Sequence, residues 1–290
     1  MAEAAGLLES AGEQVGPFER DTAVSMDGER GTETCFDAIV ADGWKAGRGP
    51  HGGYMAAMLL RALTEAVAEP RRAPRSLTIH YARAPEAGPV RIRTVLEREG
   101  RSLSTLSARI EQEGRLVALA LSAFSVPWSG PGISQLPLPD VAGPDEAREA
   151  GSALAFGAPN FTRHMIMQPR IEKPPFSGAG NPMQFGAWIG LAESRPLDAP
   201  ALAFYSDALI PAPFMGIETP SPAPTIDLTI HFRVALPRMA DPDPQELCFA
   251  RVRAGLIHEG FFEEDSVIWA ADGTVLAQSR QLAILMPPVA

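Results

Sequence analysis

The chain has 290 residues, of which 46% are hydrophobic and 21% are charged, and its net charge is −10. These values are typical of a globular protein with a large core, and the length has room for two ordinary domains. The negative charge argues against a nucleic-acid partner, because neutralising phosphates requires a basic surface. A small anionic substrate needs only a local basic patch.

The start of the chain, residues 1–30, is small, polar and acidic, and we expect a loosely ordered leader there. It lacks the basic start and apolar core of a secretory signal. No apolar run approaches the ~18 residues that a membrane span needs. Cys35 and Cys248 lie far apart, and two free thiols in a reducing, cytoplasmic protein are the expected arrangement.

An N-terminal domain is expected over residues 31–127. It begins with a short strand at 36–40 and a glycine-rich turn at 47–53, followed by a helix over 54–63 that is apolar on almost every face. Short turns then separate four predicted strands, which indicates an antiparallel meander. These strands are expected at residues 75–83, 89–98, 102–112 and 115–126.

Residues 128–158 are rich in proline and glycine and form the expected linker. In the C-terminal domain, expected over residues 159–290, a similar order of elements returns. Strands are predicted at 160–170 and 183–192, a helix at 199–210, and further strands at 224–233, 246–257, 260–270 and 274–285.

One short motif occurs in both halves. Leu77-Thr78-Ile79-His80-Tyr81 returns as Leu228-Thr229-Ile230-His231-Phe232, at an offset of 228 − 77 = 151 residues. Such self-similarity indicates a duplicated supersecondary unit. An antiparallel sheet wrapped around one apolar helix is the hotdog arrangement. The sequence therefore predicts an α+β double hotdog, in which two antiparallel sheets each wrap around a long central helix.

Four motifs resemble those of the type II acyl-CoA thioesterases: Pro50-His51-Gly52-Gly53-Tyr54, Ser206-Asp207, Thr225-Ile226-Asp227 and Leu276-Ala277-Gln278-Ser279-Arg280-Gln281. The resemblance covers roughly residues 30–286. It implies a cytoplasmic hydrolase of fatty acid metabolism that cleaves acyl-CoA to a free acid and CoA. It implies no metal or redox cofactor, and a homodimer or higher homo-oligomer.

The two copies differ at an acidic residue. Asp207 lies within the apolar second helix, whereas the corresponding position of the first helix is Ala56. A buried carboxylate requires hydrogen-bond partners, and burial and donors together tune it as a base. A solvent-facing acid explains the residue equally well from sequence alone, and the resemblance favours catalysis.

Two further polar residues complete the candidate catalytic set. Gln281 lies among small residues on the core face of its strand, where its amide needs partners and can position a water, and Ser122 is its predicted counterpart. Thr225 falls on the polar face of its strand by alternation, and the resemblance alone assigns it a catalytic role. Asp227, on the same face, is its rival.

For substrate binding we expect His51, Gly52 and Gly53, because free amides at a helix N-terminus approach a carbonyl or anion closely. A structural turn is the competing interpretation. A cluster of arginines has the charge to contact the phosphates of coenzyme A, although a solvated loop explains it as well. The cluster consists of Arg71, Arg72 and Arg75.

Other functions are less compatible with the residues. The glycine spacing at 47–52 matches a dinucleotide fingerprint, but a meander follows in place of a βαβ unit. No Gly-x-Ser-x-Gly motif is present, and the histidines lack metal-ligand spacing. Two alternatives stay open: a hotdog enoyl thioester hydratase or dehydratase with His51 as its base, and a non-catalytic acyl-CoA-binding module.

Overall fold

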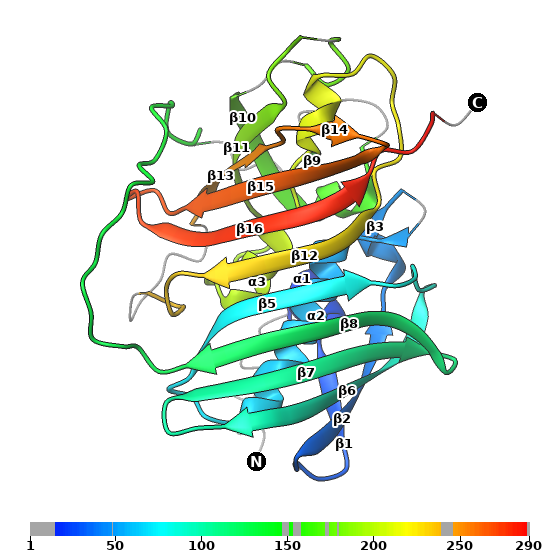
Figure 1. Cartoon of the computed structure of the whole chain (residues 1–290), viewed down its shortest axis with the longest axis vertical. Helices are drawn as coiled ribbons and strands as arrows, with labels where there is room; N and C mark the ends of the chain where they lie inside the picture. Colours follow the sequence, from blue (N-terminus) through cyan, green and yellow to red (C-terminus); the bar gives the residue numbers. More distant parts are fainter. Residues whose placement is uncertain are drawn as a thin grey trace, which may run out of the picture.

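The computed structural model describes residues 15–47, 49–146, 151–152, 158–171, 174–178, 180–238 and 246–288. Most of its strands belong to one sheet, which runs through both halves of the chain (Figure 1). The spatial order is β1-β2-β6-β7-β8-β5-β12-β16-β15-β13-β11-β10-β9, with β14 paired to β15. Parts of the predicted leader and linker, at 1–14, 147–150 and 153–157, lie outside the described residues.

The first half supplies β1 (Val24–Asp27), β2 (Glu33–Val40), β5 (Ala73–Tyr81), β6 (Gly88–Glu99), β7 (Leu103–Gln112) and β8 (Arg115–Ser125). The second half supplies β9 (Gly151–Ser152), β10 (Met165–Ile171), β11 (Gln184–Leu191), β12 (Thr225–Phe232), β13 (Cys248–Arg253), β14 (Ile257–His258), β15 (Phe261–Trp269) and β16 (Val275–Ile284). A separate ribbon contains β3 (Lys45–Ala46) and β4 (Gly49–Pro50).

The repeated motif lies where the two halves join. Strands β5 and β12 pair antiparallel, with Thr78 opposite Thr229 and their hydroxyl oxygens 3.1 Å apart. The two copies of the motif therefore pair with each other about a local two-fold relation. The prediction of two sheets differs from the structure at this point, because this pairing makes the sheet continuous.

Strand pairing also aligns the two copies residue by residue. Leu77 lies opposite Ser122, and Leu228 lies opposite Gln281. Because Leu77 and Leu228 correspond in the repeat, Ser122 is the counterpart of Gln281, as the sequence predicts. The pairing of β7 with β8 and of β15 with β16 extends this alignment, because Leu106 lies opposite Ser122 and Glu264 lies opposite Gln281.

The helices lie on one side of the sheet (Figure 1). They are α1 (Pro17–Asp21), α2 (Gly52–Val67) and α3 (Ala199–Tyr205), with 3-10 turns η1 (Asp42–Trp44), η2 (Asn160–His164) and η3 (Ala212–Met215). Helix α3 ends five residues before the predicted limit of 210, and Ser206 is its C-cap. Pro211 disfavours helical geometry at the preceding residue, which limits any extension. Asp207 therefore follows the helix and is not part of it.

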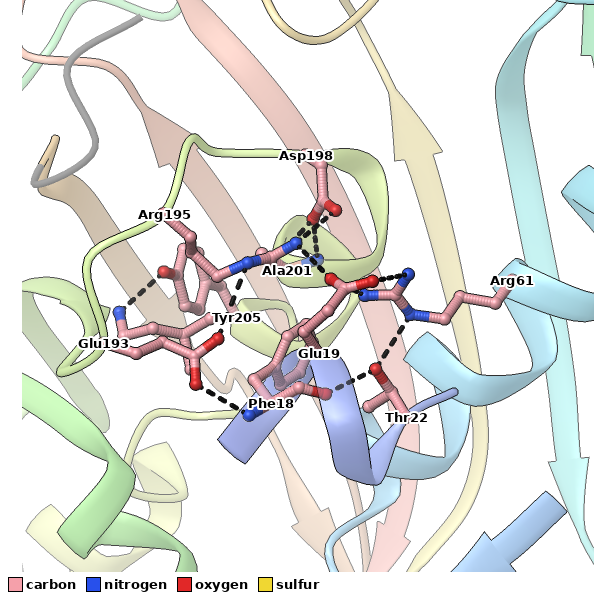
Figure 2. A network of polar contacts seen from close by, with 10 residues as sticks. Phe18, Glu19, Thr22, Arg61, Glu193, Arg195, Asp198, Ala201 and Tyr205 are labelled. Carbon is pink, nitrogen blue, oxygen red and sulfur yellow. Dashed lines mark hydrogen bonds and ion pairs between the residues drawn. The ribbon is translucent and has the colours of Figure 1, made fainter. Parts of the chain in front are cut away.

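The N-terminal segment is more structured than the predicted leader, since α1 and β1 form within residues 17–27. Phe18 is completely buried, and its ring lies 5.6 Å from the rings of both Trp44 and Phe204, measured between centroids. Glu19 binds Arg61 of α2 and Arg195 before α3, with oxygen–nitrogen distances of 2.6 and 3.0 Å (Figure 2). Helix α1 thus connects the two longer helices.

We expect Phe18→Ala to lower the free energy of unfolding by about 3 kcal/mol, because truncating a buried phenylalanine leaves a cavity. Denaturant unfolding measures this change. Val15→Ala, three residues earlier at an exposed side chain, serves as the control and is expected to shift the midpoint little. Equal stability of the two variants would show that the buried ring contributes nothing to holding the helices together.

Candidate active site

Asp207 lies where the C-terminal end of α3 meets the N-terminus of α2. Its Oδ2 accepts a hydrogen bond from the Gly53 N–H at 2.9 Å. Free N–H groups and the helix dipole favour negative charge at this end of α2. The side chain is 11% exposed, so the carboxylate is largely removed from water while the other half of the chain stabilises it.

This meeting of helices requires glycine at two positions. A Cβ on Gly53 would lie 2.5 Å from the Phe204 carbonyl oxygen, and a Cβ on Gly52 would lie 2.7 Å from Asp207 Oδ2. Tyr81 adds a further contact, because its hydroxyl donates to the Gly52 carbonyl at 2.9 Å. The glycine turn predicted to bind substrate is therefore in direct contact with the candidate base.

His51 caps α2 and has internal partners for both ring nitrogens. Its Nδ1 accepts from the Tyr54 N–H at 3.2 Å, which places the ring proton on Nε2. Nε2 donates to the Asp207 carbonyl oxygen at 2.8 Å and lies 3.6 Å from Oδ2. Burial lowers the pKa of His51 despite the nearby carboxylate. The ring is therefore a neutral structural element, with no free lone pair to accept a proton.

A β-bulge brings Thr225 into the site. In the β12–β16 pair, Thr225 lies opposite Ala283 and Asp227 opposite Leu282, so one extra residue separates them. The bulge reverses the alternation expected from sequence and places Thr225 on the face of Gln281. The Thr225 hydroxyl donates to Gln281 Oε1 at 3.0 Å. Asp227, the rival candidate, consequently lies on the opposite face.

One contact relates the Thr225–Gln281 pair to Asp207. Ser279, two residues before Gln281 on the same face, donates its hydroxyl to the carbonyl of Ser206 at 3.2 Å. Ser206 immediately precedes Asp207. The structure thus places the three predicted catalytic residues in one region, although no direct hydrogen bond between Asp207 and the pair is present among the described residues.

The first copy lacks these groups at the aligned positions. Pro74 and Ser76 flank a matching bulge in β5, so Pro74 corresponds to Thr225. Ser122 donates its hydroxyl to the Ser76 carbonyl at 2.6 Å, a purely structural bond. Ala56, the predicted counterpart of Asp207, is buried in α2. The aligned positions of the first copy thus lack the polar groups of the second.

Glu264 is a site residue that the sequence reasoning missed. Its Oε1 accepts from Gln281 Nε2 at 2.8 Å, and its Oε2 accepts from the Ala212 N–H at 2.5 Å. The signal was present in the sequence, because alternation along β15 places this acid on the same face as Phe262 and Ile268. An acid on an apolar strand face marks a candidate site residue.

Burial has the largest effect on the pKa values of the Asp207 and Glu264 carboxyl groups. It raises the pKa of Asp207, while the neighbouring His51 ring and the Gly53 hydrogen bond act in the lowering direction. Burial raises the pKa of Glu264 to about 7, with a contribution from the Asp207 charge and opposing contributions from the Ala212 N–H and the Gln281 amide. The site therefore holds two interacting carboxyl groups of elevated pKa.

The arginines predicted to contact CoA phosphates already have protein partners. Arg71 pairs with Glu69 at 2.8 Å, Arg72 donates to the Gly100 carbonyl at 2.7 Å, and Arg75 donates to the Ser125 carbonyl at 3.3 Å. These contacts favour the structural interpretation of the cluster.

Three comparisons relate the chain to known proteins. An uncharacterized protein of Mycobacterium tuberculosis is 25% identical over 285 residues, covering 90% of this chain and 94% of that protein. A hot dog fold protein of unknown function from Alicyclobacillus acidocaldarius has a TM-score of 0.81 and 24% identity, covering 94% and 98% of the two chains. An acyl-CoA thioesterase II, TesB2, from Mycobacterium marinum has a TM-score of 0.67 and 16% identity, covering 93% and 97%.

These structural likenesses show the hotdog fold. In the part of the chain that the structure describes, no helix has the length and apolar character to cross a membrane. The acyl-CoA thioesterase N-terminal domain matches residues 40–125, and the acyl-CoA thioesterase C-terminal domain matches residues 138–285. Since these matches cover well over half of its length, the chain belongs to the acyl-CoA thioesterase family.

Proposed function

We propose that this protein hydrolyses an acyl-CoA thioester to a free acid and CoA, with Asp207 activating the water and Thr225 and Gln281 positioning it. The observation that carries the proposal is the buried Asp207 carboxylate, held by the α2 N-terminus beside a hydrogen-bonded Thr225–Gln281 pair. Burial raises the pKa of this carboxyl, which makes its ionised form a stronger base than an exposed aspartate.

The reaction needs an oriented water, a base and donors for the oxyanion. Asp207 takes a proton from the water as the water oxygen bonds to the thioester carbon, giving a tetrahedral oxyanion. Collapse of that species breaks the carbon–sulfur bond, and the thiolate leaves. A typical thiol has a pKa near ~8.5, so its departure requires little acid assistance.

A donor for the carbonyl oxygen is also required. The Gly53 N–H is already bound to Asp207, and both nitrogens of His51 have internal partners. We therefore assign this role to the Gly52 N–H, which occupies the first position of α2 and has no partner within the helix. Gly53 and His51 would then support the site by fixing Asp207.

The hydratase alternative is less compatible with this geometry. Its proposed base, His51, has its Nδ1 lone pair committed to the Tyr54 N–H and a lowered pKa. In the alternative of a non-catalytic binding module, Asp207 would serve only as the hydrogen-bond acceptor of the Gly53 N–H. Keeping a carboxylate in this environment costs free energy, which a binding surface alone does not require.

A panel of acyl-CoA esters of different chain lengths, followed by free-thiol release, tests the proposal. We expect thiol release with at least one ester, and analysis of the same mixtures by mass should show the free acid. Binding of the esters without thiol release would favour the binding module. Addition of water to an enoyl-CoA without thiol release would favour the hydratase.

Thr225→Val is expected to lower kcat by about 10-fold, because it removes the hydroxyl that holds Gln281 Oε1 while keeping the side-chain shape. The free-thiol assay measures this loss. Thr229→Val on the same strand is the matched control, since its hydroxyl contacts Thr78 at the seam and lies away from Gln281. Equal activity of the two variants would remove Thr225 from the catalytic set.

A further inference from the structure

Glu264 is an acid in a position that the fold fills with an apolar residue elsewhere. It lies opposite Gln281 in the β15–β16 pair and is 4% exposed. In the first copy, the residue opposite Ser122 in the β7–β8 pair is Leu106, which is completely buried. Because Ser122 and Gln281 correspond, Leu106 and Glu264 correspond as well. The first copy therefore packs this position of its sheet, Leu106, without an acid.

The hydrogen bonds of Glu264 determine which way the Gln281 amide faces. A carboxylate oxygen only accepts, so the Gln281 NH2 group must face Glu264 Oε1. The Gln281 oxygen then faces Thr225 and accepts from its hydroxyl. The Ala212 N–H holds Glu264 itself through the other oxygen.

We propose that Glu264 is a positioning residue that fixes the orientation of the Gln281 amide and, through it, the Thr225 hydroxyl. This inference rests on the function proposed above. With the Thr225 proton directed at Gln281, the Thr225 oxygen offers only lone pairs to a water. Within the described part of the chain, Gln281 Nε2 bonds only to Glu264, so its second N–H stays available as a donor. The pair then presents one acceptor and one donor, as the orientation of a water requires.

The charge state of Glu264 is set by its surroundings. Among the described residues, the other charged groups that act on it are Asp207, after α3, and Asp265, its neighbour on β15. Asp265 faces the opposite side of the strand and pairs with Arg280 at 2.7 Å. Since the pKa of Glu264 is about 7, this carboxyl group changes its charge within the neutral pH range. Its hydrogen bond with the Gln281 amide changes with that charge.

The variant Glu264→Gln tests the orientation directly. A glutamine that accepts from the Ala212 N–H presents its own NH2 group to Gln281, so the Gln281 amide must turn over. We expect kcat for acyl-CoA hydrolysis to fall by about 10-fold, with KM changed less than about two-fold. The pH profile of kcat should lose its change near neutrality. Glu263→Gln, the neighbouring acid, is the control and should match the wild type.

A double variant separates positioning from a general effect on packing. If Glu264 acts through Gln281, then Glu264→Gln combined with Gln281→Ala should be no slower than Gln281→Ala alone. Losses that multiply would overturn the inference. Glu264→Leu, which reproduces the residue of the first copy, gives a second variant expected to fold and to show the same non-additivity.

An NMR measurement on the protein without substrate tests the role of Glu264 independently of the proposed hydrolysis. The side-chain NH2 signals of Gln281 in a nitrogen-15 spectrum are identified by their absence in Gln281→Leu. We expect them to shift with pH, with a midpoint near 7, in the wild type and to stay constant in Glu264→Gln. Signals in the wild type that match those of Glu264→Gln at every pH would overturn the positioning role. Absence of thiol release from every ester would instead overturn the proposed function alone.

Discussion

Replacing Asp207 with asparagine is expected to lower kcat/KM for acyl-CoA hydrolysis by at least about 100-fold, the usual minimum for loss of a general base. The asparagine oxygen can still accept from the Gly53 N–H, so the helix contact is kept while the base is lost. The free-thiol assay measures the change. Asp227→Asn is the matched control, because the bulge places Asp227 on the opposite face of β12. Similar rates for both variants would remove Asp207 from the mechanism.

The same substitution should raise stability at neutral pH. The pKa of Asp207 is raised in the folded protein, so the unfolded state loses its proton at lower pH than the folded state. Stability therefore falls as pH rises from the ordinary pKa of aspartate through the raised value, and the full cost is present above it. An asparagine at this position carries no such cost, because its amide does not ionise. A higher free energy of unfolding for Asp207→Asn at pH 7, with the difference disappearing in acid, is the expected result.

Gly53→Ala is expected to produce the second large effect, a loss of activity of about 100-fold. The added Cβ would lie 2.5 Å from the Phe204 carbonyl oxygen and 3.1 Å from Asp207 Cβ, so the two helices must move apart. This separation stretches the hydrogen bond that orients Asp207. It should also lower the free energy of unfolding by about 2 kcal/mol, a typical cost of overpacking.

Gly130→Ala provides the control for this substitution, because a Cβ at Gly130 meets no atom within 4 Å. Denaturant unfolding and thiol release should both match the wild type for this variant. If Gly53→Ala also matched the wild type in both assays, the close approach of α2 to Asp207 would be irrelevant to the reaction.

Much of this architecture follows from local sequence patterns. The repeat, the β6-β7-β8 part of the expected meander and the position of Gln281 were predictable because alternation and turn residues act over a few neighbours. Strand β5, expected to pair with β6 as the first strand of that meander, pairs with β8 instead. Comparing the copies also identified Ser122 as the counterpart of Gln281, which the strand register confirms. The joining of the halves through β5 and β12 was not predictable, since pairing between distant strand edges leaves no local pattern.

The errors at the site have equally specific causes. Period-two alternation predicts Thr225 on the polar face, and the prediction fails because alternation does not hold across a bulge, which depends on pairing with another strand. Glu264 was missed although its strand pattern indicated a buried acid. The partner of Asp207, the Gly53 N–H, comes from the other half of the chain and could not be identified without the three-dimensional arrangement.

Helix α1 also bears on how the protein can be divided. The family match begins at residue 40, so Phe18 and Glu19 lie before it. A recombinant fragment that starts at that boundary would uncover the rings of Trp44 and Phe204 and leave Arg61 and Arg195 without Glu19. Such a fragment would expose apolar surface and tend to aggregate. The smallest autonomous folding unit of this protein is therefore larger than the region by which its family is recognised.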